Sequence, residues 1–278
     1  MLQKKSFHLS TRNTEARLPV TREVPYFQFP GLSAYPDLAH FVFTRHGGVS
    51  DSVFGSLNVS TSTGDRAKSV ETNLSIIREI TGARSLRFLN QVHGKDIVIL
   101  RESHLQDEQP PFTADAMITD LAGVALLVKQ ADCQAVVLYD PDRKVISNVH
   151  CGWRGSVHGL LSAVVAAMRA EFGCEPSRLR AAIGPSLGPC CAEFVTYAEI
   201  FPKSFRPFMV RDNYFDLWAL SRSQLVQSGL DEAHIETAGW CTRCQTDLFY
   251  SHRAEGTTGR FATVVMLKPR PPFWRPRL

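Results

Sequence analysis

Three side chains able to bind a metal stand at the ends of predicted strands. Cys133 precedes an apolar run over residues 135–138, and His150 follows a second run over residues 144–149. The turn signal Asp-Pro-Asp-Arg at residues 140–143 joins the two runs into a β-hairpin. Because antiparallel pairing brings the entrance and the exit of a hairpin together, we expect the thiol and the imidazole to share one site.

A third candidate ligand, His93, ends the strand predicted over residues 86–92. Two nitrogens and one sulfur leave the fourth position of a tetrahedron open, as catalytic zinc requires. One cysteine and two histidines are also the ligand set of a mononuclear copper centre. Residue type and spacing alone leave a third interpretation open, in which the cysteine and the histidines are ordinary core residues.

The elements that must position these ligands predict an α+β fold, a single domain of mixed β-sheets packed together with helices on the outside. Apolar residues recur at helical spacing over residues 67–80, 156–172 and 216–226. Residues 184–213 show neither helical spacing of apolar residues nor the short apolar runs typical of strands. Short apolar runs bounded by turns predict the remaining strands, at residues 38–44, 97–100, 114–119, 123–128, 180–184, 235–240 and 260–268.

Composition bounds the domain. The 278 residues are 44% hydrophobic, enough to bury a full core. We expect a poorly ordered arm over residues 1–25, one folded domain over residues 26–268, and a basic, proline-rich tail over residues 269–278. The net charge of +4 is matched by four basic residues near the C-terminus, the first of them Lys268. The remainder of the chain therefore has a net charge of zero, which argues against a nucleic-acid partner.

No apolar run is long enough to span a membrane, and no apolar stretch follows the early lysines as in a signal peptide, so we expect a cytoplasmic protein without a membrane partner. The 7 cysteines are odd in number and irregularly spaced, which favours thiols or metal ligands over disulfides. The pair Cys241 and Cys244 imitates part of a zinc deaminase signature behind Cys191 and Glu193. No proline precedes Cys241 and the gap is long, so we discount this deaminase-like site. Cys241 and Cys244 could still form a redox or metal pair, and the roles of Cys190 and Cys191 also stay open.

A series of short motifs follows one order between about residues 38 and 268. They are Thr44-Arg45, 47–50, Leu57-Asn58, Gln91 to Gly94, Thr113 to Ala116, Ala131 to Cys133, His150, Gly152 to Gly155, Ala182 to Pro185, Cys241-Thr242 and Thr258 to Arg260. In this order they resemble the laccase-domain family. Its members have been named multicopper polyphenol oxidase, peptidoglycan editing factor and purine nucleoside phosphorylase.

The resemblance implies that His93, Cys133 and His150 hold a metal, usually zinc, with copper as the alternative. It implies a catalytic laccase domain that acts as a purine nucleoside phosphorylase on adenosine, inosine and methylthioadenosine and also deaminates adenosine. The partners would be a small-molecule nucleoside and phosphate, and the oligomeric state stays open. The sequence departs from the family at Cys151, where alanine is usual, and after Cys133, where Gln134 and Ala135 stand in the place of the usual proline. Cys151 is thus a candidate metal competitor or oxidation site.

This chemistry assigns further roles. Phosphorolysis must hold a phosphate, and Arg154, before the predicted helix, and Arg45, beside a Gly-Gly turn, are the candidates for it. For Arg45 a structural salt bridge is the alternative. Asn58 is a candidate substrate contact or simply part of a polar turn. Asp115 and Asp132 are candidates to orient the imidazoles, or else caps of strand ends.

For deamination, Cys133 would bind the metal as a thiolate, and a metal-bound water would supply the nucleophile. Two other functions remain, a copper-dependent polyphenol oxidase and a factor that edits peptidoglycan precursors. A multicopper oxidase needs many histidine ligands, typically in His-x-His pairs, and none of the 9 histidines is arranged in this way.

Overall fold

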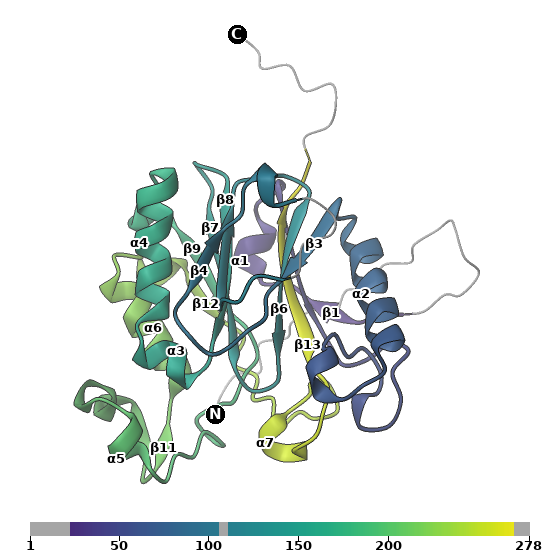
Figure 1. Cartoon of the computed structure of the whole chain (residues 1–278). Coiled ribbons are helices and arrows are strands. Elements are labelled where there is room, and N and C mark those ends of the chain that lie inside the picture. Colours follow the sequence, from purple (N-terminus) through teal and green to yellow (C-terminus); the bar gives the residue numbers. More distant parts are fainter. Residues whose placement is uncertain (1–22, 106–110, 270–278) are drawn as a thin grey trace.

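Two β-sheets packed face to face form the centre of the computed structural model, which describes residues 23–105 and 111–269 (Figure 1). The first sheet is antiparallel except for the pair at one edge, β6 and β3, which is parallel. Its strand order is β1 (Tyr26–Phe27), β2 (Leu38–Phe43), β13 (Phe261–Leu267), β6 (Val124–Gln130) and β3 (Ser85–Phe88).

The second sheet is antiparallel in its middle and parallel at both edges. Its strand order is β12 (Ile235–Thr237), β9 (Arg180–Ile183), β7 (Gln134–Asp140), β8 (Val145–Cys151), β5 (Ala116–Thr119) and β4 (Ile97–Ile99). A separate small ribbon pairs β10 (Met209–Arg211) with β11 (Tyr214–Phe215). The predicted hairpin is confirmed as β7 and β8.

Helices cover the outer faces of the two sheets, which confirms the predicted α+β class (Figure 1). Helix α2 (Ala67–Thr81) packs on the first sheet, and α4 (Leu160–Phe172) and α6 (Leu217–Gln227) pack on the second. The shorter helices are α1 (Pro30–Ser33), α3 (Trp153–Val157), α5 (Tyr197–Ile200) and α7 (His252–Glu255). Short 3₁₀ helices lie at Ser52–Phe54, Thr61–Thr63, Glu102–His104, Pro176–Arg178, Lys203–Phe208 and Glu232–His234.

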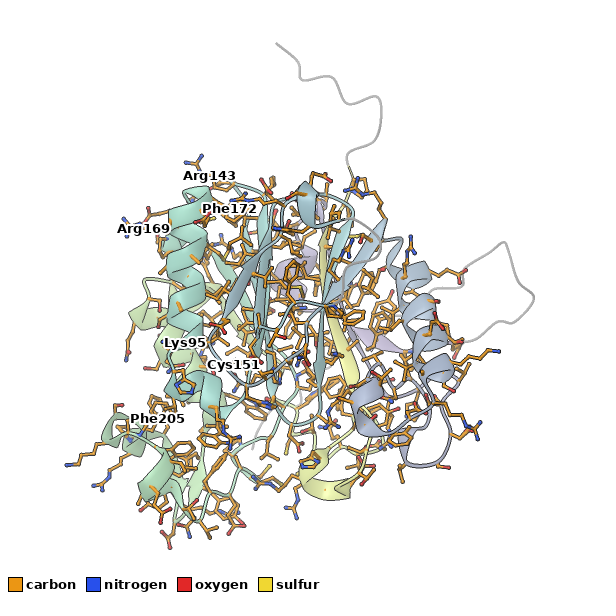
Figure 2. All side chains as sticks on the ribbon, viewed as in Figure 1. Lys95, Arg143, Cys151, Arg169, Phe172 and Phe205 are labelled. Atoms are coloured by element: carbon orange, nitrogen blue, oxygen red, sulfur yellow. The ribbon has the colours of Figure 1, made fainter. Side chains whose placement is uncertain are left out.

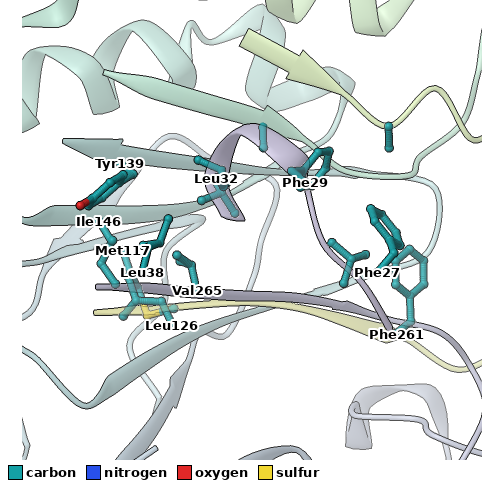
Figure 3. Packing of buried hydrophobic residues seen from close by; sticks show 14 of the residues in the cluster. Phe27, Phe29, Leu32, Leu38, Met117, Leu126, Tyr139, Ile146, Phe261 and Val265 are labelled. Carbon is teal, nitrogen blue, oxygen red and sulfur yellow. The ribbon is translucent and has the colours of Figure 1, made fainter. Parts of the chain in front are cut away.

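The main core lies between the sheets, where Leu38 and Val265 of the first sheet face Tyr139 and Ile146 of the second (Figure 3). Successive side chains of β7 point alternately into this core and toward α4. Both faces are therefore buried, which explains why residues 135–138 are continuously apolar rather than alternating.

A buried amide joins the two sheets. Asn148 of β8 is 0% exposed, and its Nδ2 donates to the carbonyl of Leu126 at 2.8 Å and to that of Thr263 at 2.9 Å. Both carbonyls belong to the opposite sheet. Because a buried donor left unpaired is costly, these two hydrogen bonds favour one lateral position of the hairpin on the first sheet.

Several predicted boundaries were wrong. The helix expected over residues 156–172 is two helices, α3 and α4, because Gly159 lies between them with φ +71°. The strands expected over residues 86–92 and 235–240 stop at Phe88 and Thr237, where the chain leaves the sheets. These ends could not be read from the sequence because the apolar residues continue into the loops.

The unassigned residues 184–213 pack around a cluster of their own with α6. Phe194, Phe201, Phe205 and Phe215 contact one another in it without a regular spacing. Of the predicted arm and tail, residues 1–22 and 270–278 lie outside the described residues. Within the described residues, no helix has the length and apolar content that crossing a membrane requires.

The buried His40 of β2 predicts a loss of stability in mild acid. Its Nε2 accepts a hydrogen bond from the Phe29 amide at 2.7 Å, and burial lowers the pKa of the imidazole to about 4. The unfolded imidazole binds a proton near pH 6.5, so stability falls as the pH drops from about 6.5 toward 4. From pH 7 to pH 5 we expect a loss of about 2 kcal/mol from this group.

His40→Gln keeps an acceptor for the Phe29 amide but does not titrate. Urea unfolding at the two pH values should therefore show a smaller acid loss for the variant. Identical losses in both proteins would contradict the assignment.

Candidate active site

The register of the central hairpin brings two predicted ligands together. Gln134 pairs with Cys151 and Ala135 pairs with His150, so Cys133 lies just beyond the paired end of β7 (Figure 1). Arg143, in the turn of the hairpin, lies at the opposite end from Cys151 (Figure 2). Antiparallel pairing has thus joined the entrance and the exit of the hairpin.

His93 completes the group from the loop after β3. The ligand atoms of His93, Cys133 and His150 all lie within 4.8 Å of one another, and the two imidazole rings meet edge to face with centroids 4.8 Å apart. No sequence spacing sets the approach of His93, because the two sheets supply these residues separately. Packing of the sheets places the loop after β3 against the end of the hairpin.

Asp115 orients both histidines. Its Oδ1 accepts hydrogen bonds from Nδ1 of His150 at 2.8 Å and from the amide of His93 at 3.0 Å, and its Oδ2 accepts from the Gly94 amide at 2.7 Å. The bond to Nδ1 leaves Nε2 of His150 as the nitrogen that could bind a metal. The amide bonds hold His93 at φ +60°, a left-handed conformation that a histidine adopts only when its surroundings impose it.

The hydrogen bonds of Asp132 go to a neighbouring loop. Its Oδ1 accepts from the hydroxyls of Thr242 and Ser251, both at 2.7 Å, and its Oδ2 accepts from the Arg253 amide at 2.6 Å. No imidazole in the described part of the chain forms a hydrogen bond with it. Asp132 instead attaches the segment of residues 242–253 to the residue that precedes Cys133.

Gly152 gives the ligands their space. A Cβ at this position would lie 2.8 Å from Sγ of Cys133 and 3.2 Å from Cδ2 of His93. Its backbone conformation is one that any residue adopts, so lack of space is the reason for glycine here.

Neighbouring charges prepare the thiol to bind a metal. Burial by itself raises the pKa of Cys133, but the charge of His150 and hydrogen bonds from both imidazoles outweigh it and lower the pKa to about 6. For His150, burial acts to lower the pKa, whereas the Cys133 thiolate and Asp115 raise it. The thiolate is the form that binds metals, and two imidazoles with one thiolate fit zinc. The residues present therefore fit the implied metal.

Cys151 is not a competitor for this metal. Alternation along β8 turns its side chain to the helical side of the sheet, where its Sγ lies 3.5 Å from Oγ of Ser156 among the residues under α4. Burial raises the pKa of this thiol to about 12, so it stays protonated. Both properties correct the expectation of a competing ligand or an oxidation site.

A cavity of about 790 Å³ opens over the three ligands at the end of the interface between the sheets. Among the described residues, its lining contains the cationic side chains Lys129, Arg154, Arg253 and Arg260 but a single acidic one, Asp132, whose carboxylate is already hydrogen-bonded. An excess of positive charge favours an anionic ligand. Aromatic rings of Phe88, Trp153 and Phe194 also line the cavity and offer flat apolar surfaces.

Of the two predicted phosphate-binding arginines, only Arg154 lines the cavity. It lies within α3 rather than before it, is exposed, and stacks on the Trp153 ring at 4.4 Å. No carboxylate of the described residues forms an ion pair with it. Arg45 does not line the cavity; its guanidinium binds Glu255 at 2.8 Å and the carbonyls of Gly55 and Thr246. The salt-bridge alternative describes Arg45.

Asn58 lies behind the cavity wall. It is 0% exposed, and its Oδ1 accepts hydrogen bonds from the amides of Ser60 at 3.1 Å and of Arg260 at 2.8 Å. Those two residues line the cavity, whereas Asn58 does not. Its position supports the wall and corresponds to the polar-turn alternative.

Sequence reasoning missed three cationic residues of the lining. Arg260, whose pKa burial lowers, lies near Cys133 although it is far from it in the sequence. Its Thr-Gly-Arg motif was part of the resemblance, but spacing gave it no chemical role. Lys129 carried a signal, a charged side chain inside an apolar strand, and burial lowers its pKa. No local feature of the sequence pointed to Arg253.

Fold and site together define the protein class. The chain belongs to the family described as multi-copper polyphenol oxidoreductase laccase, whose model matches residues 39–268. It is 35% identical over 235 residues to a purine nucleoside phosphorylase of Xylella fastidiosa, covering 79% of this chain and 88% of that protein. A purine nucleoside phosphorylase of Bacteroides thetaiotaomicron is 29% identical over 269 residues, covering 90% and 99%.

Solved structures agree with the fold. YlmD from Geobacillus stearothermophilus superposes with a TM-score of 0.78 at 29% identity, over 88% of this chain and 96% of that chain. The hypothetical protein YfiH of Bacillus licheniformis also has a TM-score of 0.78, at 25% identity, over 91% and 98%. These similarities confirm the resemblance and the fold class inferred from the sequence.

Gly152→Ala should weaken metal binding by on the order of tenfold or more, because the new Cβ forces the Cys133 thiol or the His93 ring out of position. Zn²⁺ titration against a competing chelator measures the affinity. Gly94→Ala is the matched control, because its Cβ would meet nothing closer than 3.5 Å. Equal affinities for the two variants would show that Gly152 serves only the fold.

Proposed function

We propose that this chain is a zinc-dependent purine nucleoside phosphorylase, acting on adenosine, inosine and methylthioadenosine, and that it also deaminates adenosine. The observation that carries the proposal is the cavity itself. It combines three ligands for one metal with cationic side chains suited to phosphate and aromatic rings suited to a purine. The names of the relatives support the same activity.

In this proposal His93, Cys133 and His150 hold zinc, which supplies a Lewis acid and lowers the pKa of bound water. Arg154 and Arg260 bind phosphate in the cavity, and Lys129 adds positive charge. Trp153 offers its ring to the purine. A phosphate oxygen bonds to C1′ of the ribose as the C1′–N9 bond breaks; the base takes a proton and leaves, and ribose 1-phosphate remains. In deamination, water adds at C6 and ammonia leaves, giving inosine.

The arrangement supports zinc chemistry over copper-dependent oxidation. Of the described residues, two groups can hold a metal, and the histidines in them are His93 and His150. A multicopper oxidase needs further histidines close by. Product analysis separates the two activities: adenosine with phosphate should yield adenine and ribose 1-phosphate, and a phenol with oxygen should not be consumed. The opposite pair of results would reject the proposal.

Arg154→Lys should raise the KM for phosphate by about 10- to 100-fold, because lysine keeps the charge but loses the paired donors. Deamination, which needs no phosphate, should change little. Both reactions are followed by chromatography of the products at several phosphate concentrations.

Arg45→Lys is the matched control. Because the Arg45 guanidinium already binds Glu255 and two carbonyls, we expect this variant to lose thermal stability while its dependence on phosphate stays that of the parent. The same behaviour in Arg154→Lys would show that Arg154 is a structural residue.

Cys133→Ser should remove one equivalent of zinc and abolish both reactions, since a serine hydroxyl is a poor ligand for zinc. Cys151→Ser, which changes a thiol on the opposite face of the hairpin, should keep this zinc. Elemental analysis of the purified variants measures the loss. Full zinc retention in a folded Cys133→Ser, His150→Ala double variant would refute the ligand assignment.

A further inference from the structure

Four cysteines far apart in the sequence meet near the cavity. Cys190 and Cys191 lie in the segment that follows β9, and Cys241 and Cys244 lie in the segment that follows β12. Their sulfurs all lie within 4.8 Å of one another. Sγ of Cys244 is 3.6 Å from that of Cys190 and 3.5 Å from that of Cys191. The sequence shows only two separate pairs, and two ligands alone seldom hold zinc.

The distances between the sulfurs fit one metal ion. With zinc–sulfur bonds of about 2.3 Å, the sulfurs of a regular tetrahedron are about 3.8 Å apart. All four cysteines are free thiols, so no disulfide explains their approach. A four-iron cluster requires a wider arrangement, because its inorganic core lies between the cysteine sulfurs. The spacing here leaves room for a single ion.

Hydrophobic packing does not explain the group. A buried cysteine is ordinarily a small apolar residue, and Cys191 and Cys241 are buried in this way. Cys190 and Cys244, however, are exposed. Two exposed thiols that turn toward two buried ones gain little from burial, whereas a shared metal accounts for all four.

From this geometry we propose that Cys190, Cys191, Cys241 and Cys244 form a second zinc site, a closed structural one. Tetrahedral sulfur sites of this kind hold zinc without an open position. On binding, zinc forms four bonds to sulfur and the thiol protons pass to solvent.

The surroundings supply the partners that such a site needs. Four thiolates around Zn²⁺ leave a charge of −2, which favours nearby donors and cations. The Gly188 amide donates to Sγ of Cys241 at 3.3 Å, and Nη1 of Arg243 donates to Sγ of Cys191 at 3.6 Å. Arg211 and Arg253 donate to the carbonyls of Cys190 and Cys191, at 3.2 and 3.5 Å.

The site would stabilise one wall of the cavity. The two cysteine-bearing segments are already paired, since the Thr242 amide donates to the Ser186 carbonyl at 3.0 Å. The Thr242 hydroxyl and the Arg253 amide then bind Asp132, next to Cys133. A metal between the segments would therefore act on the position of Asp132 without touching substrate.

Elemental analysis of the reduced, full-length protein tests the proposal. We expect two zinc ions per chain, one in Cys133→Ser and one in Cys244→Ser. Cys174→Ala, which changes a buried cysteine outside both groups, should keep two. After replacement of zinc by cobalt, the sulfur-to-cobalt charge-transfer absorption should persist in Cys133→Ser and fall sharply in Cys244→Ser.

A measurement on the unmodified protein keeps the test independent of folding of the variants. The exposed thiols of Cys190 and Cys244 should resist alkylation in the zinc-loaded protein and react at least tenfold faster after a chelator removes the metal. Mass spectrometry of peptides identifies the alkylated cysteines. One zinc per chain after incubation with excess Zn²⁺, with equal alkylation rates in both states, would overturn the proposal. Neither result depends on phosphorolysis, so the outcome is separate from that of the proposed function.

Discussion

The candidate active site depends on one buried carboxylate. Asp115 is 0% exposed, and it binds a ring nitrogen of His150 and the backbone amides of His93 and Gly94. A buried carboxylate is stable only when its oxygens are fully hydrogen-bonded, so these donors and the carboxylate require one another. Through this requirement, a single residue sets the orientation of one imidazole and the backbone conformation of the other.

The interface between the sheets makes this arrangement rigid. Asn148 lies on the same face of β8 as His150 and binds carbonyls of the opposite sheet, two residues before the ligand. The cavity opens where that interface ends, so its walls come from both sheets. Alternation on β8 also separates the thiol of Cys151 from that of Cys133, and the two differ in pKa because one has imidazole neighbours and the other does not.

The charged residues considered for the site fall into two groups, those bound within the chain and those free to bind a ligand. Asp132 and Arg45 are fully engaged within the chain and hold loops in place. Arg154 has only the stacking contact with Trp153 among the contacts of its side chain with described residues, which leaves its donors available to a ligand. Residue type does not distinguish these arginines; the position of a neighbouring carboxylate does.

The sequence by itself determined the fold class, the hairpin of β7 and β8, and the three candidate ligands, because strand periodicity and turn residues are local signals and the motif order resembled a known family. Only the tertiary structure decided the rest. It joined His93 to the hairpin, split the helix at Gly159, separated Arg154 from Arg45, and brought Cys190 and Cys191 to Cys241 and Cys244. These results depend on contacts between segments far apart in the chain, and no local pattern of residues encodes which distant segments meet.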